Sequence, residues 1–262
     1  MVMLRLAAMP LWLSALLFVL LPTLLAMAGP LLVRRYVTLE KLTDNNEIAG
    51  FKFAALGVVY AVMLAFAVVV VWEKFRDAEE AVAREAGAAV ALDRLSNGLA
   101  APERAALREG LRRYLRLAIA EDWPAMSEAR AAPSVTAALA ALYTLALAAD
   151  ADTGRGSAVL QTMLETLSQM TEARRERLAL SGGVVPALVW LVLVVSAVLT
   201  MVFTFFFGTR NLAAQIMMTG MLGATIFLAL LVVLAVEHPF TGDVHVGPGP
   251  LQLVLEGLGE GG

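Results

Sequence analysis

The stretch Asn45–Ala78, NNEIAGFKFAALGVVYAVMLAFAVVVVWEKFRDA, sets the expected fold of this chain. It opens with polar residues, stays uncharged from Phe53 to Trp72, and then becomes charged with no Gly or Pro at the junction. A run of about 20 apolar residues is enough to cross a bilayer. Since nothing at the junction would end a helix, the stretch predicts one helix that leaves the membrane and continues into water.

The continuation of this helix is amphipathic. Apolar residues recur at spacings of three, four or seven from Phe75 to Leu99, and charged residues occupy the other faces. Gly98 and Pro102 provide the stop signal. At 1.5 Å per residue, a helix from Glu47 to Asn97 would be about 75 Å long, well beyond the thickness of a bilayer.

The composition excludes several classes of protein. The chain has 262 residues, 60% of them hydrophobic and 16% charged, which is too apolar for a soluble domain. A net charge of -3 makes nucleic acid an unlikely partner. The absence of Cys excludes disulfides and thiolate metal sites, and His238 and His245 form no known metal motif. We therefore expect no metal, no cofactor and no enzymatic activity.

Four uncharged runs are long enough to span a bilayer, and they predict an all-α integral membrane protein. Gly208 and Arg210 interrupt the last long run with turn chemistry, which favours a tight hairpin of two spans. The expected organisation is a helical cytoplasmic domain inserted between spans two and three. Transmembrane helices 1 and 2 are expected within 1–72, with spans at about 9–32 and 50–72, and the helical domain at 73–183. Transmembrane helices 3 and 4 are expected within 184–237, followed by a C-terminal tail at 238–262.

The first apolar run has two interpretations. Arg5 and the sequence Ala26-Met27-Ala28 resemble a signal peptide with its cleavage site, but the run is much longer than the roughly 7 to 15 residues of an h-region. A retained first span is favoured. Pro22 is expected to kink it.

The start of the second span carries polar residues with two interpretations. Asn45 or Asn46 suits a helix N-cap, and Glu47 in the first turn would favour the positive end of the helix dipole. A role at a pore entrance is the alternative. Capping alone explains these residue types.

Two stripes run along the second span. Small residues spaced by four let two helix backbones approach closely; they are Gly57, Ala61 and Ala65. A bulkier stripe lies roughly opposite and consists of Val58, Val62, Phe66 and Val69. This second stripe is expected to meet either lipid or the axis of an oligomer, where it would form a hydrophobic constriction.

The predicted domain contains two acidic patterns that resemble sites. Glu121 and Asp122 precede Trp123, but a helix junction with Asp122 as N-cap is favoured over a functional carboxylate pair. Asp150 and Asp152 resemble the start of a calcium loop, yet the fifth position of that pattern is not Asp or Asn, so an ordinary turn is favoured.

Basic residues next to the spans indicate the topology. Arg174, Arg175 and Arg177 precede the third span, where they are expected to contact anionic lipid head groups. Seven basic residues on the side of the domain against five on the other favour cytoplasmic N- and C-termini in a bacterial inner membrane. The last two spans hold no charge, which argues against an ion-coupled transporter. In the tail, the apolar stretch Leu251–Leu258 is expected to dock on the domain.

The chain resembles a bacterial membrane-protein family that carries a bestrophin-like domain of unassigned function. The likeness spans most of the chain, and its most specific elements are NE-x-AGF and WE. The residues that carry it are Asn46-Glu47-x-Ala49-Gly50-Phe51, Gly57, Tyr60, Leu64, Phe66, Trp72-Glu73, Arg174–Leu178, Pro186, Trp190 and Pro239-Phe240-x-Gly242.

More distantly, Leu64-Ala65-Phe66 and Trp72-Glu73 resemble bestrophins, pentameric anion channels whose second membrane helix lines the pore and narrows at a hydrophobic neck. The resemblance implies a homo-oligomer, namely a pentamer, that conducts chloride or other small anions. The acidic cluster with which animal bestrophins bind calcium has no match in this sequence, so calcium gating is not implied.

Two functions follow from these observations. The first is a homo-oligomeric ion channel with its constriction on the second span. The alternative is a membrane-anchored scaffold or signalling adaptor that acts through its helical domain, and the lack of polar groups at membrane depth supports it. Subunit number discriminates between them, because a closed ring favours a channel.

Overall fold

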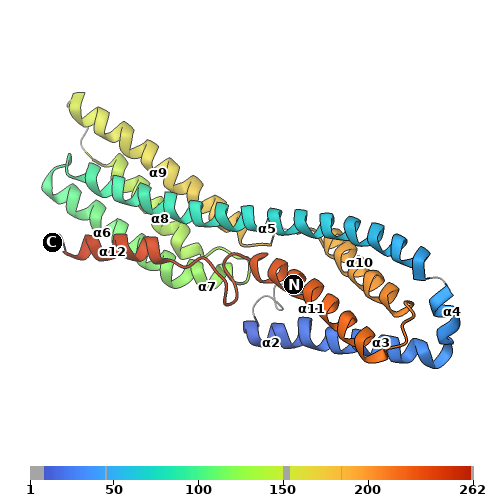
Figure 1. Cartoon of the computed structure of the whole chain (residues 1–262). Helices are drawn as coiled ribbons and strands as arrows, with labels where there is room; N and C mark the ends of the chain where they lie inside the picture. The colour runs from blue at the N-terminus through green and yellow to red at the C-terminus, as the bar shows by residue number, and fades with distance from the viewer. Residues whose placement is uncertain (1–8, 45, 150–153, 184, 261–262) are drawn as a thin grey trace. The chain divides into compact units, whose positions relative to one another are not determined.

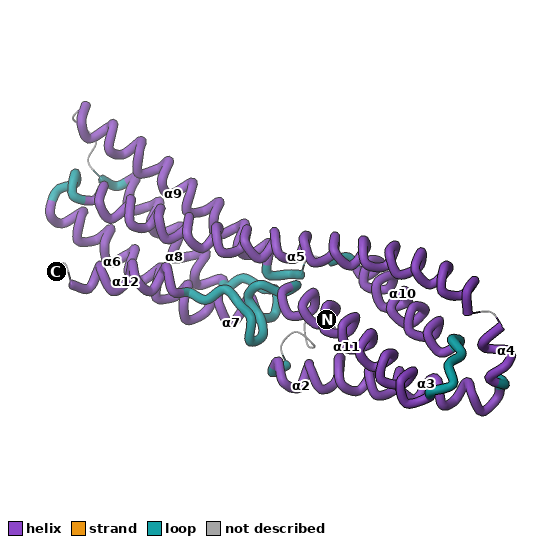
Figure 2. Tube along the Cα trace, viewed as in Figure 1, coloured by secondary structure: helices purple, strands orange, loops and turns teal. Residues whose placement is uncertain are grey.

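The computed structural model describes residues 9–44, 46–149, 154–183 and 185–260, and these residues form helices joined by loops, with no strand among them (Figure 2). They divide into two compact units. The membrane unit comprises the described residues up to Glu73, 185–237 and Gly242–Val244; the helical unit comprises Lys74–Gly183, His238–Thr241 and the described residues from His245 onward.

Four helices in the described part of the chain are long and apolar enough to cross a membrane (Figure 1). They confirm the all-α fold class and the four predicted apolar helices. The segments are Leu11–Tyr36, Asn46–Ser96, Ala187–Phe205 and Leu212–Val236.

The longest helix is α5 (Asn46–Ser96), which has 51 residues and contains no Pro. The N–H of Gly98 bonds to the carbonyl of Leu95 at 2.9 Å, and Pro102 lies in the first turn of the next helix. The continuous helix predicted from Glu47 to Asn97 is therefore confirmed, within one residue at each end.

The first apolar helix is not regular along its length. It consists of α2 (Leu11–Ala15), a π-helical turn η1 (Leu16–Leu20) and α3 (Leu21–Tyr36). Pro22 has no N–H to donate to the carbonyl of Phe18, and a wider turn directly before it accommodates this loss. The disturbance predicted at Pro22 thus takes the form of a π turn.

The core of the membrane unit is formed by α3, α10 (Ala187–Phe205) and α11 (Leu212–Val236), which pack against one another. Glycines allow the close approach, since a Cβ added at Gly220 would lie 2.8 Å from the Sδ of Met27. The short helix α4 (Leu39–Asp44) connects α3 to the start of α5.

The helical unit surrounds a core of Leu, Met and Ala side chains. Besides the second half of α5, its elements are α6 (Ala101–Leu117), the π-helical turn η2 (Ala118–Asp122), α7 (Trp123–Met126), α8 (Pro133–Leu147), α9 (Gly154–Leu180) and α12 (Gly249–Glu260). Leu251 and Leu258 of α12 are buried in the same core, which confirms that the apolar part of the tail docks on this unit.

Candidate functional site

The bulky stripe of α5 is uncovered by every described part of the chain. Val58, Val62, Phe66 and Val69 are 64%, 49%, 68% and 51% exposed. The opposite face of the helix is buried, and it carries Tyr60, Ala67 and Val71 at 3%, 7% and 1% exposure. Lipid or another copy of the chain must therefore meet the stripe, as expected for either interpretation of it.

The small-residue stripe packs against no described part of this chain. A Cβ added at Gly57 would meet no atom within 4 Å, and Ala61 and Ala65 are exposed. The helix instead uses larger side chains for contact, since Tyr60 and Leu64 join the core of the membrane unit. The close helix packing predicted for Gly57, Ala61 and Ala65 therefore has no partner helix among the described residues. Their packing against a neighbouring copy stays a prediction.

The first residue of α5 holds the hairpin between α10 and α11. The Asn46 side chain donates from Nδ2 to the Gly208 carbonyl at 2.6 Å and accepts the Gly208 N–H on Oδ1 at 2.9 Å. The pairing satisfies both backbone groups of a tight loop. Asn46 is thus a tether between distant segments, whereas Asn45 lies outside the described residues. Glu47 is exposed in the first turn of α5.

A second polar contact closes the same loop. Arg34 at the end of α3 donates to the carbonyl of Thr209 and, at 2.8 Å, to Oε1 of Gln215. Gln215 in turn donates from Nε2 to the carbonyl of Phe207 at 2.6 Å. The predicted hairpin is confirmed, with Asn211 as the N-cap of α11.

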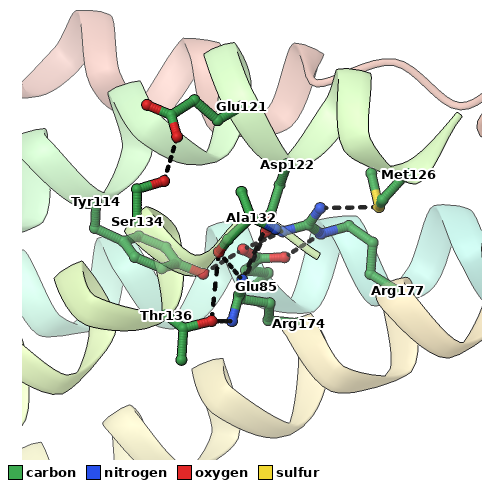
Figure 3. Close-up of polar contacts among 10 residues, drawn as sticks. All are labelled: Glu85, Tyr114, Glu121, Asp122, Met126, Ala132, Ser134, Thr136, Arg174 and Arg177. Atoms are coloured by element: carbon green, nitrogen blue, oxygen red, sulfur yellow. Dashed lines mark hydrogen bonds and ion pairs between the residues drawn. The ribbon is translucent and has the colours of Figure 1, made fainter. Parts of the chain in front are cut away.

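A buried ionic network joins four segments of the helical unit (Figure 3). Arg177 of α9 binds Glu85 of α5 through two hydrogen bonds, Nε–Oε2 at 2.6 Å and Nη2–Oε1 at 3.0 Å, and both side chains are completely buried. Tyr114 of α6 donates its hydroxyl to the same Glu85 carboxylate at 2.6 Å. The guanidinium also lies 4.5 Å from the ring centroid of Trp123.

Asp122 in η2 is the second acid of the network. Its carboxylate accepts Nε of Arg174 at 2.8 Å, Nη2 of Arg177 at 3.2 Å and the N–H of Ala132 at 2.9 Å. The predicted N-cap role of Asp122 was wrong, because its side chain makes no capping bond at α7. The π-helical turn that contains Asp122 continues from α6, so the separate helix expected to start there is only the four-residue α7.

The network is balanced in charge, with two guanidinium groups and two carboxylates. Burial is the largest single influence and lowers the pKa of Arg177, but Glu85, Tyr114 and Asp122 together raise it by more, and the net shift is upward. Burial, followed by the charge of Glu85, raises the pKa of the Tyr114 phenol well above its ordinary value. The arginine therefore stays charged and the phenol neutral, which is the state that these hydrogen bonds require.

The buried network overturns part of the lipid prediction. Arg174 and Arg177 are 5% and 0% exposed, so their guanidinium groups do not contact head groups. Each has a carboxylate partner inside the helical unit, which compensates for the loss of water. Arg175 is exposed, and its contact with lipid head groups stays a prediction.

A sequence signal for this burial was present. The apolar stripe of α9, Met163, Leu167 and Met170, continues at spacings of four and three into Arg174 and Arg177. Residues at this spacing share one helix face, so the two arginines lie on the buried side. Among the residues that the structure describes, no group of three His, Asp or Glu side chains could hold a metal ion.

Comparison with known families gives one match. A family model described as a bestrophin-like domain matches residues 20–251. Among curated proteins, none matches the chain.

Several solved structures share the fold. A bacterial bestrophin homologue from Klebsiella pneumoniae superposes with a TM-score of 0.72 at 15% identity, over 92% of this chain and 97% of that one. Two mutant forms of a homologue from the same organism give TM-scores of 0.72 and 0.73 at 18% and 16% identity, each over 94% of this chain and over 99% and 98% of theirs. At such low identity the likeness concerns the fold alone.

Proposed function

Because this chain belongs to the bestrophin-like family, whose model matches residues 20–251, we propose that copies of it assemble into an ion channel. In this assembly α5 of each copy lines a central pore, and the stripe of Val58, Val62, Phe66 and Val69 forms an apolar constriction. Residues 73–183 lie in the cytoplasm with both termini, in a bacterial inner membrane.

One observation carries the proposal: the longest helix leaves an apolar stripe uncovered directly opposite its buried face. A ring of copies around one axis would bring these stripes together at its centre. Apolar constrictions of this kind gate by excluding water. The resemblance to bestrophins implies five copies and chloride as the ion, so chloride and potassium fluxes are the quantities to measure.

We expect Phe66→Ala to raise ion flux several-fold in liposomes that contain the purified protein. The substitution removes a ring that is 68% exposed and projects from the uncovered side of α5, which widens the constriction and lowers the cost of wetting it. Flux is measured with ion-sensitive dyes at matched protein content.

Trp12→Ala is the matched control, because Trp12 is an equally exposed aromatic (70%) of the membrane unit that lies on α2 instead of α5. Its flux should equal that of the unsubstituted protein. Absence of any ion flux, together with a monomer or dimer in images of the detergent-solubilised particle, would contradict the channel and favour the adaptor.

A further inference from the structure

We propose that a pocket between α5, α10 and α11 of the membrane unit binds one phospholipid of the bilayer, with an acyl chain in the pocket and the phosphate at Arg34. The pocket has a volume of about 360 Å³, which lies within the range of small-molecule sites. It uses none of the residues of the proposed constriction, so the inference stands whether or not copies of the chain conduct ions.

The wall of this pocket is largely apolar. Phe53 of α5 meets Phe207 of the α10–α11 loop edge to face, with ring centroids 5.6 Å apart. Met218 and Leu222 of α11 extend the apolar wall. Thr219 also lines the pocket, is 4% exposed, and forms no hydrogen bond with any described residue. A ligand with an apolar chain and an oxygen acceptor for this hydroxyl suits such a wall, because a buried hydroxyl is unfavourable without a partner.

The depth of the pocket corresponds to one leaflet of a bilayer. Its lining includes the loop residues Gly208 and Thr209 at one end and Leu222 of α11 at the other. Leu222 follows the first residue of α11, Leu212, by ten positions, or about 15 Å along the helix. Since the hydrocarbon core of a bilayer is about 30 Å thick, the pocket runs from the membrane edge to the middle of the bilayer. An acyl chain of one leaflet occupies the same depth.

Arg34 places a positive charge at the edge end of the pocket without an acidic partner. Its guanidinium donates to the carbonyl of Thr209 and, at 2.8 Å, to Oε1 of Gln215, and both of these residues line the pocket. The Nε of Arg34 is buried and meets no acceptor in the described part of the chain. Asp44 and Glu47, acids near the same loop, are exposed and form no described ion pair with Arg34.

A lipid phosphate is the anion that fits this charge. Removing a cation from water is unfavourable unless an anion pairs with it, and the dipole at the C-terminal end of α3 compensates only in part. Guanidinium groups bind phosphate through charge-assisted hydrogen bonds. Because Arg34 lies in the last turn of an apolar helix long enough to span the membrane, the phosphate at its depth is that of a lipid head group. Arg210, exposed next to Thr209, adds a second positive charge at this edge.

The test is lipid binding to the full-length protein, delipidated in detergent and measured by native mass spectrometry. Dioleoyl phosphatidylglycerol should bind on the order of tenfold more tightly than dioleoylglycerol, which has the same chains but no phosphate. Arg34→Gln should lower the affinity for phosphatidylglycerol on the order of tenfold. Arg35→Gln is the matched control, because Arg35 is an exposed arginine in the same helical turn, and it should leave the affinity unchanged.

Leu222→Trp tests the pocket independently of the charge. The larger side chain would fill the space of the acyl chain, so the affinity for phosphatidylglycerol should fall at least several-fold. Met221→Trp is its control, because Met221 is the neighbouring residue of α11, is 65% exposed and lies outside the pocket lining. The thermal unfolding midpoint of each lipid-free variant checks that it is folded.

Thr219→Val provides a second test that keeps the shape of the side chain. It removes only a hydroxyl that has no partner among the described residues, so it should weaken lipid binding several-fold without lowering the midpoint of the lipid-free protein. Equal affinities of the Leu222→Trp and Met221→Trp proteins, or an unchanged affinity of Thr219→Val, would overturn the pocket as the site of the chain. Equal affinities for phosphatidylglycerol and dioleoylglycerol would overturn the assignment of the phosphate to Arg34.

Discussion

Arg177→Met is expected to destabilise the helical unit by about 3–5 kcal/mol, the cost typical of removing one partner from a buried ion pair. The substitution leaves the Glu85 carboxylate completely buried with only the Tyr114 hydroxyl as a donor. It also removes one donor from Asp122, which keeps Arg174 and the N–H of Ala132. The free energy of unfolding is measured by urea titration of the detergent-solubilised protein.

Arg130→Met is the control, because it removes an arginine that lies outside the buried network. Arg130 pairs with Glu128 at the surface, where the two side chains are 69% and 62% exposed, and surface pairs contribute about 0–1 kcal/mol. Glu85→Leu combined with Arg177→Met should cost less than the sum of the two single substitutions, since no lone charge from the Glu85–Arg177 pair then remains buried. If Arg177→Met and Arg130→Met had equal free energies of unfolding, the buried network would not stabilise the helical unit more than a surface ion pair does, and the prediction would be wrong.

The features that could be predicted from the sequence depend on local patterns. The α5 helix followed from an uncharged run, an amphipathic continuation and the absence of Gly and Pro at the junction between them. The hairpin before α11 followed from turn chemistry around Gly208 and one charge at Arg210. In both cases neighbouring residues determine the structure, so a single sequence is sufficient.

The ionic network could not be predicted in this way, because its partners are distant in the chain. Arg174 and Asp122 are 52 residues apart, and Arg177 and Glu85 are 92 apart. Charged residues are mostly exposed in proteins, which is why three arginines beside a span were interpreted as a contact with lipid. Only the position of Arg174 and Arg177 on the apolar stripe of α9 indicates that they are buried. That position does not identify the acidic residue with which each arginine pairs.

The contacts of the uncovered stripe of α5 could not be predicted for a different reason. Spacing identified its residues correctly as one face of a helix, and the structure leaves that face exposed. What meets Phe66 or Val62 depends on other copies of the chain, and neither one sequence nor one chain contains that contact. The pore lining proposed for this stripe is therefore tested by conductance experiments on assembled copies.

Gly208→Ala is expected to destabilise the membrane unit by about 1–3 kcal/mol, the usual cost of forcing an extra carbon into a packed site. A Cβ at this position would lie 2.7 Å from the backbone N of Thr43 and 2.8 Å from the carbonyl carbon of Leu42. Backbone atoms cannot rotate away, so the loop must shift. Any shift weakens the two hydrogen bonds that Asn46 makes to Gly208. The change is measured as the thermal unfolding midpoint in detergent.

Gly50→Ala is the matched control, because a Cβ at Gly50 would meet no atom within 4 Å, and its midpoint should not fall. Asn46→Ala should itself cost about 1–3 kcal/mol, since it leaves the N–H and carbonyl of a buried loop residue without their partner. As Gly208→Ala and Asn46→Ala act on the same contact, their effects should be less than additive in the double variant. Full additivity would mean that the Asn46 contact survives the shift of the loop, and that the tether and the close packing of Gly208 hold the hairpin independently.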